Sequence, residues 1–229
     1  MSQVPSNKVT IIGLGNIGYA VAVNLVKGGR PVVVADRNIE KAKKVAKELG
    51  NLVHPMEIPA AILEGDIIVF AVWFSAIKEL LHVYSRELQG KIIVDPSNPI
   101  APDDKGGFKK IIDEKESAGE ILSMLLPKDA KLVKALGTLG AATLTGAAFQ
   151  KPERAVLFYA SDDTGVDGAA EGLIRDNGFE PVRVGGLDQS IRIEVFGDLH
   201  EYGALGKNVT LSEAREKAGI GSAIHSSTH

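Results

Sequence analysis

Short apolar runs alternate with segments of helical periodicity along most of the chain. The apolar runs, which predict strands, cover residues 8–12, 31–36, 52–54, 66–72, 91–95, 131–136, 155–160 and 179–184. The segments between them predict helices over residues 19–27, 38–49, 59–64, 75–88, 116–126, 165–177 and 190–202. Strands that alternate with helices are typical of a parallel sheet covered by helices on both faces. The pattern therefore predicts an α/β fold with a doubly wound, mainly parallel sheet.

The first apolar run ends in a glycine-rich turn that leads directly into a helical segment. The turn has the pattern G-x-G-x-x-G and comprises Gly13, Leu14, Gly15, Asn16, Ile17 and Gly18. In a strand–turn–helix context the first glycine allows the tight turn, and the second lets a pyrophosphate approach the backbone. The third lets the helix pack on the strand, and the helix N-terminus then faces the phosphates. The context favours a Rossmann-type dinucleotide site over a simple tight turn.

The second half of the chain differs from the first without an obvious linker. A charged, glycine-containing loop at 103–107 and a stretch of small residues at 137–146 interrupt the regular alternation. We predict a Rossmann NAD(P)-binding domain at 1–136 and a small C-terminal α/β extension at 137–229 that completes the substrate pocket. The small residues at 137–146 would let a flat ring lie against the backbone. They are equally suited to tight packing within the protein or to a dimer interface. We expect a homodimer.

Composition excludes several classes of protein. The chain has 229 residues, a formal net charge of −3, 45% hydrophobic residues and no cysteine. No basic run supports binding to nucleic acid, and no apolar stretch reaches the roughly 20 residues that span a bilayer. The absence of cysteine excludes disulfides and thiolate metal sites. The five histidines are scattered, so we expect no metal, no nucleic-acid or membrane partner, and a cytoplasmic protein.

Several stretches, taken in order, resemble the F420-dependent NADP oxidoreductase family, to which the NADPH-binding domain of the STEAP metalloreductases is related. They are the glycine turn, Ala71-Val72-Trp73 before a helix, residues 91–95 with the Pro-Ser-Asn-Pro turn that follows, residues 132–139, and residues 185–187. The resemblance covers about residues 8–203. It implies hydride transfer between NADP(H) and a deazaflavin, coenzyme F420, with Ala71 and Val72 at the cofactor.

The residues after the second strand leave the choice of cofactor open. Asp36 stands where NADP-specific family members have a small residue, and a carboxylate there suits the ribose hydroxyls of NAD. Arg37 and Lys41 match phosphate-contacting positions of the family and could bind a 2′-phosphate. Alternatively, both are surface charges on a basic helix face.

A pocket for the hydride acceptor is predicted where three strands end. Trp73, the turn residues Ser97 and Asn98, and the segment that comprises Gly137, Thr138 and Leu139 lie there. Trp73 and Phe74 could wall the nicotinamide pocket or form a core pair, and Ser75 could touch the cofactor or only cap its helix. Asn98 offers a donor and an acceptor to a carboxamide or a flavin-like ring. The family has Asn or His at position 137, so Gly137 predicts a more open pocket.

The sequence contains no nucleophile–base pattern, and the catalytic residues are unknown; His200 and Tyr202 are candidate proton donors. Hydride transfer between two cofactor rings needs contact and a dry pocket rather than a protein acid. We therefore expect an oxidoreductase that passes hydride between NADP(H), or NAD(H), and a deazaflavin or flavin-like acceptor. The alternatives are a non-catalytic module that senses NAD(P)(H) and a reductase of a small carbonyl or imine.

Overall fold

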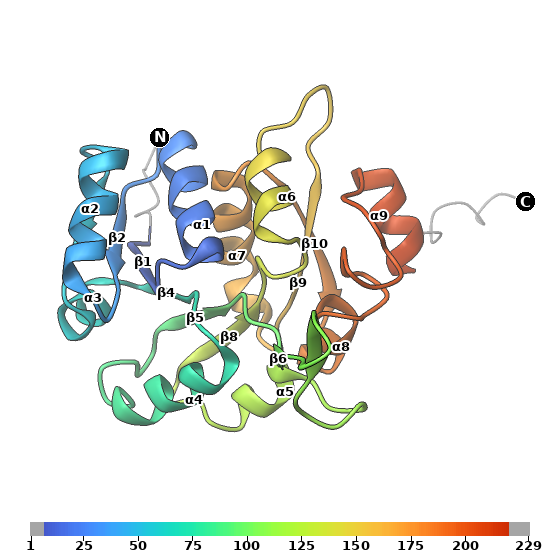
Figure 1. Ribbon diagram of the computed structural model, residues 1–229, viewed down its shortest axis with the longest axis horizontal. Coiled ribbons are helices and arrows are strands. Elements are labelled where there is room, and N and C mark those ends of the chain that lie inside the picture. Colours follow the sequence, from blue (N-terminus) through green and yellow to red (C-terminus); the bar gives the residue numbers. More distant parts are fainter. Residues whose placement is uncertain (1–6, 220–229) are drawn as a thin grey trace, which may run out of the picture.

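A computed structural model describes residues 7–219 as helices packed on both faces of a central sheet (Figure 1). The sheet has eight strands in the order β10-β9-β8-β5-β4-β1-β2-β3. Its strands are β1 (Val9–Ile12), β2 (Val32–Ala35), β3 (Val53–Pro55), β4 (Ile67–Phe70), β5 (Ile92–Asp95), β8 (Lys131–Lys134), β9 (Val156–Ala160) and β10 (Glu180–Gly185). The helices are α1 (Asn16–Lys27), α2 (Ile39–Leu49), α3 (Ile58–Glu64), α4 (Phe74–Val83), α5 (Ala118–Ser123), α6 (Ala141–Gly146), α7 (Asp167–Asp176), α8 (Ser190–Ile193) and α9 (Leu211–Ala218), with 3₁₀ turns η1 (Thr164–Val166) and η2 (Leu187–Gln189).

The sheet is parallel from β3 across to β8, and β9 and β10 run in the opposite direction. This confirms the predicted doubly wound, mainly parallel α/β fold. β1 lies between β2 and β4, so the strand order reverses beside it. Open α/β sheets bind their ligands at such a reversal, outside the carboxyl ends of the strands.

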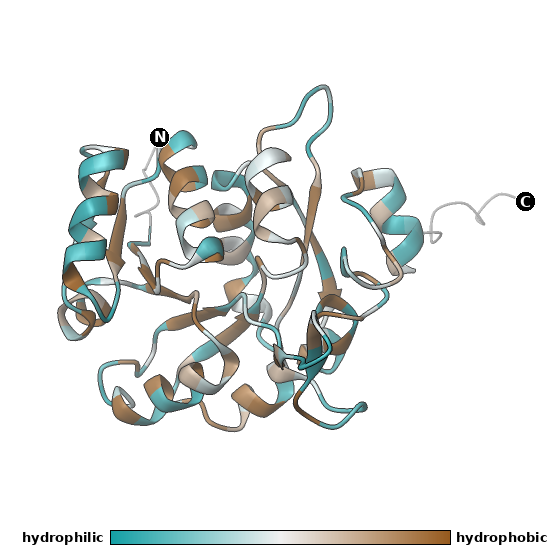
Figure 2. Ribbon diagram, viewed as in Figure 1, coloured by the Kyte–Doolittle hydropathy of each residue, from teal (hydrophilic) through white to brown (hydrophobic). Residues whose placement is uncertain are grey.

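The strands are apolar on both faces because both faces are covered. Val9, Ile11, Ile67 and Val69 pack with α1, α2, α6 and α7, whereas the alternate strand residues pack with α3, α4 and α5. Side chains of successive strand residues point to opposite faces, so a strand covered on both sides contains an unbroken apolar run. Figure 2 shows this as hydrophobic colour along the central strands. None of the helices within 7–219 is long and apolar enough to cross a membrane.

The C-terminal part of the chain completes the same sheet. β9 and β10 extend it beyond β8, and their outer face packs against residues of α8, α9 and the segment between them. The predicted domain boundary after residue 136 stays a prediction, and the last ten residues of the predicted extension lie outside the described part of the chain.

Three helices and one hairpin differ from the sequence prediction. The helix predicted over 190–202 is wrong, because α8 ends at Ile193 and turns follow. Residues 100–110 form a short antiparallel hairpin of β6 (Ile100–Pro102) and β7 (Phe108–Lys110) that was not predicted. The small residues at 141–146 form α6, and α9 was also missed. These segments are short or rich in small residues, so they have too little periodicity to identify them.

Candidate functional site

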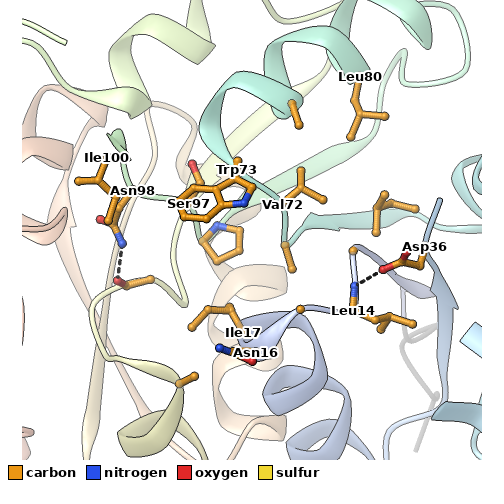
Figure 3. A pocket seen from close by; sticks show the side chains of 18 of the residues that line it. Leu14, Asn16, Ile17, Asp36, Val72, Trp73, Leu80, Ser97, Asn98 and Ile100 are labelled. Carbon is orange, nitrogen blue, oxygen red and sulfur yellow. Dashed lines mark hydrogen bonds between the residues drawn. The ribbon is translucent and has the colours of Figure 1, made fainter. Parts of the chain in front are cut away.

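A cleft of about 1230 Å³ runs along the edge of the sheet where β1, β2, β4, β5 and β8 end (Figure 3). Its lining contains nearly all the residues predicted for the site: Gly13, Leu14, Gly15, Asn16, Ile17, Asp36, Arg37, Lys41, Ala71, Val72, Trp73, Ser97, Asn98, Gly137 and Leu139. Residues from five separate segments of the chain therefore meet in one cleft, because the strands that precede them end at the same edge of the sheet.

The glycine turn has the geometry that a pyrophosphate needs. Gly13 has φ +93°, and a Cβ there would lie 2.6 Å from the Ala71 carbonyl oxygen. A Cβ on Gly18 would collide with the Gly13 carbonyl oxygen, so Gly18 packs α1 onto the turn and does not itself line the cleft. At Gly15, by contrast, a Cβ would meet nothing within 4 Å. The open space at Gly15, at the start of α1, fits a dinucleotide pyrophosphate.

Asp36 is turned toward the glycine turn. Its carboxylate accepts hydrogen bonds from the backbone N–H of Leu14 at 2.9 Å and of Asn38 at 3.2 Å, the first of which Figure 3 draws. The Lys41 ammonium lies 3.5 Å from the same carboxylate. Burial alone would raise the pKa of Asp36. The two N–H groups and Lys41 outweigh burial and hold that pKa below its ordinary value, so Asp36 is ionised and partly neutralised by its neighbours.

The two aromatic residues after β4, Trp73 and Phe74, lie in different environments. Trp73 is 56% exposed and lines the cleft, whereas Phe74, the first residue of α4, is 2% exposed and packs in the hydrophobic core. Trp73, not Ser75, is the N-cap residue of α4. The structure therefore supports the cleft role for Trp73 and contradicts the capping role for Ser75, because α4 begins one residue earlier than predicted.

Asn98 connects three segments at the far end of the cleft. Its side-chain N–H donates to the Gly137 carbonyl at 3.2 Å, and its carbonyl oxygen accepts from the Val195 N–H at 2.7 Å. The side-chain oxygen of Asn98, which the sequence predicted to accept a hydrogen bond from a ligand, therefore accepts one from the protein itself. Asn98 positions the loops after β5, β8 and α8 relative to one another.

The predicted opening at Gly137 is wrong. A Cβ at position 137 would collide with the Pro96 carbonyl oxygen rather than point into the cleft. Thr138 also differs from the prediction, since it is 1% exposed and is absent from the lining. Glycine at 137 thus lets two backbone segments approach closely, and only its own backbone borders the cleft.

A buried ion cluster, which the sequence analysis missed, lies beneath this end. The Lys134 ammonium is 2.7 Å from a carboxylate oxygen of Asp95 and 3.8 Å from one of Glu194, and it also donates to the Ser97 carbonyl. Glu194 in turn accepts two N–H groups at the start of α5. Burial raises the pKa of Glu194, against the opposing effect of Lys134. The sequence did contain a signal for this cluster. Lys134 ends one apolar strand and Asp95 ends another, and such residues on neighbouring strands can form a buried ion pair.

His200 is a structural residue rather than a proton donor. It is 1% exposed, its Nδ1 accepts the Tyr202 N–H, and its Nε2 lies 2.9 Å from the Gly137 carbonyl. Because Nδ1 accepts, Nε2 carries the proton and donates it to that carbonyl. Burial lowers the pKa of His200 to about 4. His200 is therefore neutral at pH 7, and both of its nitrogens are engaged.

Three further aromatic side chains border the same end, of which the sequence analysis singled out Tyr202 alone. Phe108 on β7 and Phe196 after α8 line the cleft and are 53% and 54% exposed, and Tyr202 is 63% exposed. Within residues 7–219 no group of three or more His, Asp or Glu side chains could hold a metal ion. Backbone amides and charged groups thus surround one end of the cleft, and aromatic and small residues surround the other.

Residues 8–99 match the model of the family described as "NADP oxidoreductase coenzyme F420-dependent". The chain is 28% identical over 196 residues to Metalloreductase STEAP3 of Rattus norvegicus, which covers 85% of this chain but only 37% of that protein. It is 24% identical over 205 residues to the F420-dependent NADP reductase of Methanothermobacter thermautotrophicus, covering 85% and 88% of the two chains. The crystal structure of hypothetical protein SMa0349 from Sinorhizobium meliloti is 30% identical, with a TM-score of 0.76 over 89% of this chain and 95% of that one.

Proposed function

Since the chain belongs to the family of coenzyme F420-dependent NADP oxidoreductases, we propose that it passes a hydride between NADP(H) and a flat ring acceptor, a deazaflavin of the F420 type or a flavin-like ring. The broader class, an NAD(P)-dependent oxidoreductase, follows from family membership. The observation that carries the specific proposal is the cleft itself. It joins a pyrophosphate-binding glycine turn to an aromatic pocket with room for a second ring.

The residues at the adenosine end support NADP(H) over NAD(H). A free carboxylate after β2 would bind ribose hydroxyls and repel a 2′-phosphate. In this chain the Asp36 carboxylate already accepts two backbone N–H groups and faces Lys41. Arg37 and Lys41 line the cleft beside it. We therefore assign the 2′-phosphate to Arg37 and Lys41, and to Asp36 the role of holding the turn and orienting Lys41.

At the opposite end of the cleft, the nicotinamide would meet the acceptor, and hydride transfer between two rings there needs no protein acid. When bound, NADPH supplies the hydride from its nicotinamide ring. The residues of the chain orient the two rings and exclude water. His200, the buried candidate donor, has both nitrogens engaged by backbone groups. A reductase of carbonyls or imines would need a proton donor beside the nicotinamide, and Tyr202, which lines the cleft, is the candidate that remains for that alternative. Similarity to coenzyme F420-dependent oxidoreductases favours the ring acceptor.

The test is oxidation of NADPH, followed at its own absorbance band, with deazaflavin and flavin acceptors. We expect turnover with a ring acceptor and a lower KM for NADPH than for NADH. Tight binding of NADPH without turnover on any ring acceptor would contradict the proposal and favour a module that senses the cofactor. The homodimer and the cytoplasmic location remain predictions.

A further inference from the structure

Helix α4 presents apolar side chains both to the core and to the cleft. The residues buried in the core are Phe74, Ile77 and Leu81. The apolar residues that line the cleft instead are Ala76, Leu80 and Val83, whose spacing places them on one side of the helix. Val83 is 64% exposed although it is apolar. An apolar surface of this kind at a concave site is typical of a surface that a ligand covers.

This side of α4 belongs to the dinucleotide end of the cleft. Ile58, which also lines the cleft, is the first residue of α3 and follows β3, the neighbour of β2. Figure 3 shows Leu80 on the same side of the cleft as Asp36. In NADP(H) the adenine is joined to the ribose that carries the 2′-phosphate, which we assigned to Arg37 and Lys41. The apolar side of α4 is therefore the surface available to the adenine ring.

Glu79 places a carboxylate within this apolar surface. It is exposed and lines the cleft, and within residues 7–219 no hydrogen bond or ion pair engages its carboxylate. The Asp36 carboxylate, in contrast, accepts two N–H groups and faces Lys41. The lysine next to Glu79, Lys78, lies over the Phe74 ring, with its Nζ 4.9 Å from the ring centroid. Glu79 therefore keeps its full capacity to accept hydrogen bonds from a ligand.

We propose that Glu79 accepts a hydrogen bond from the exocyclic amine of the adenine of NADP(H), and that it thereby selects adenine over a purine with a carbonyl at that position. The inference rests on the proposed NADP(H) site and adds a specificity-determining residue to it. The adenine amine is a donor, and a carboxylate is an acceptor only. A carbonyl in its place would set two acceptors against each other without a proton between them, so the same contact would become unfavourable.

The experiment compares NADP⁺ with its analogue in which hypoxanthine replaces adenine, so that a carbonyl stands in place of the amine. Calorimetric titration measures both affinities. We expect the analogue to bind the unaltered protein about fivefold more weakly or worse, the range for loss of one hydrogen bond to a charged group. The two nucleotides have the same phosphates and the same nicotinamide, so the ratio of their affinities isolates the contact at the base.

Glu79→Gln supplies the decisive variant. An amide can accept from the adenine amine or donate to the hypoxanthine carbonyl, so the ratio should fall below about twofold. Glu114→Gln, which removes the same charge from an exposed position outside the cleft, should keep the ratio of the unaltered protein. Glu79→Lys replaces the acceptor with a donor and should make the hypoxanthine analogue the tighter ligand. A ratio that is unchanged in both variants of Glu79 would overturn the inference.

The remaining outcomes separate this inference from the proposed hydride transfer. Equal affinities of the unaltered protein for the two nucleotides would overturn the role of Glu79, while turnover with a ring acceptor would still support the hydride transfer. A preference for NADP⁺ that Glu79→Gln abolishes, without turnover on any ring acceptor, would contradict the hydride transfer and leave the role of Glu79 standing. Failure of both nucleotides to bind would overturn both.

Discussion

The two ends of the cleft are built in different ways. The dinucleotide end depends on backbone: a turn in which Gly13 and Gly18 permit close approach and Gly15 leaves space, with Arg37 and Lys41 at its surface. The other end depends on side chains from distant segments, fixed by Asn98 and by the ion cluster of Lys134, Asp95 and Glu194. The first is encoded by a short continuous stretch, and the second exists only after the whole sheet has formed.

The largest expected effect is on the ion cluster. Lys134→Met leaves two buried carboxylates without their cation, which costs roughly 3–5 kcal/mol of unfolding free energy. Lys131→Met is the matched control, because Lys131 pairs with Asp163 at 2.9 Å but is 45% exposed, and such pairs contribute roughly 0–1 kcal/mol. Urea denaturation measures both. If the two variants lose similar stability, the cluster does not hold the acceptor end.

The next variant breaks the dinucleotide end alone. Gly15→Val places a branched side chain where the protein leaves open space, so we expect binding of NADPH to weaken by more than about 100-fold, or ~3 kcal/mol, with the fold retained. Gly172→Val, at an equally open position on α7, should leave binding unchanged. Calorimetric titration with NADPH measures both. Wild-type affinity in folded Gly15→Val would place the dinucleotide elsewhere.

Arg37 sharpens the assignment of the 2′-phosphate. Arg37→Ala should weaken NADPH by about 1.5–3 kcal/mol, the range for a hydrogen bond to a charged group, and should barely affect NADH. Lys44→Ala, an exposed lysine of α2 outside the cleft, is the control. If Arg37→Ala weakens the binding of NADPH and NADH equally, Arg37 does not contact the 2′-phosphate, and Asp36 is then the ligand of the NAD ribose.

Gly137 tests the packing of the other end. Gly137→Ala should lower stability by about 1–3 kcal/mol, because the new Cβ meets the Pro96 backbone. NADPH affinity of the remaining folded protein should change little, since the phosphates bind at the opposite end. Thermal melting and titration separate the two quantities. A stable variant with a smaller pocket would restore the view that position 137 faces the acceptor.

The last expected effect is a dependence of stability on pH. His200 has a pKa of about 4 in the folded protein against about 6.5 when unfolded, so between these values only the unfolded chain takes up a proton. Stability should therefore fall on acidification through this range, by up to about 1.4 kcal/mol per pH unit. His200→Asn should remove that slope, and His54→Asn, at an exposed position, should not. Identical slopes in the two variants would show that His200 is not buried as a neutral group.

The sequence predicted the fold and the dinucleotide end because their signals are local. A strand, a glycine turn and a helix occupy consecutive residues, and each glycine has its own steric reason. Asn98, His200 and Lys134 could not be assigned in this way, since their partners lie far along the chain. Phe196 follows a four-residue helix in a segment without periodicity, which concealed its place at the cleft. The prediction of a more open pocket at Gly137 was wrong because the space beside this glycine is filled by the backbone of Pro96.

A crystal structure with NADP⁺ and a flavin-like acceptor will show whether the two ends of one cleft hold the two reactants. We expect the 2′-phosphate beside Arg37 and Lys41 and the pyrophosphate at Gly15. We expect the nicotinamide near Trp73 and Asn98, with the acceptor ring stacked against it among Phe108, Phe196 and Tyr202. A nicotinamide directed away from Asn98, or an acceptor ring bound outside the aromatic end, would contradict this arrangement of the reactants.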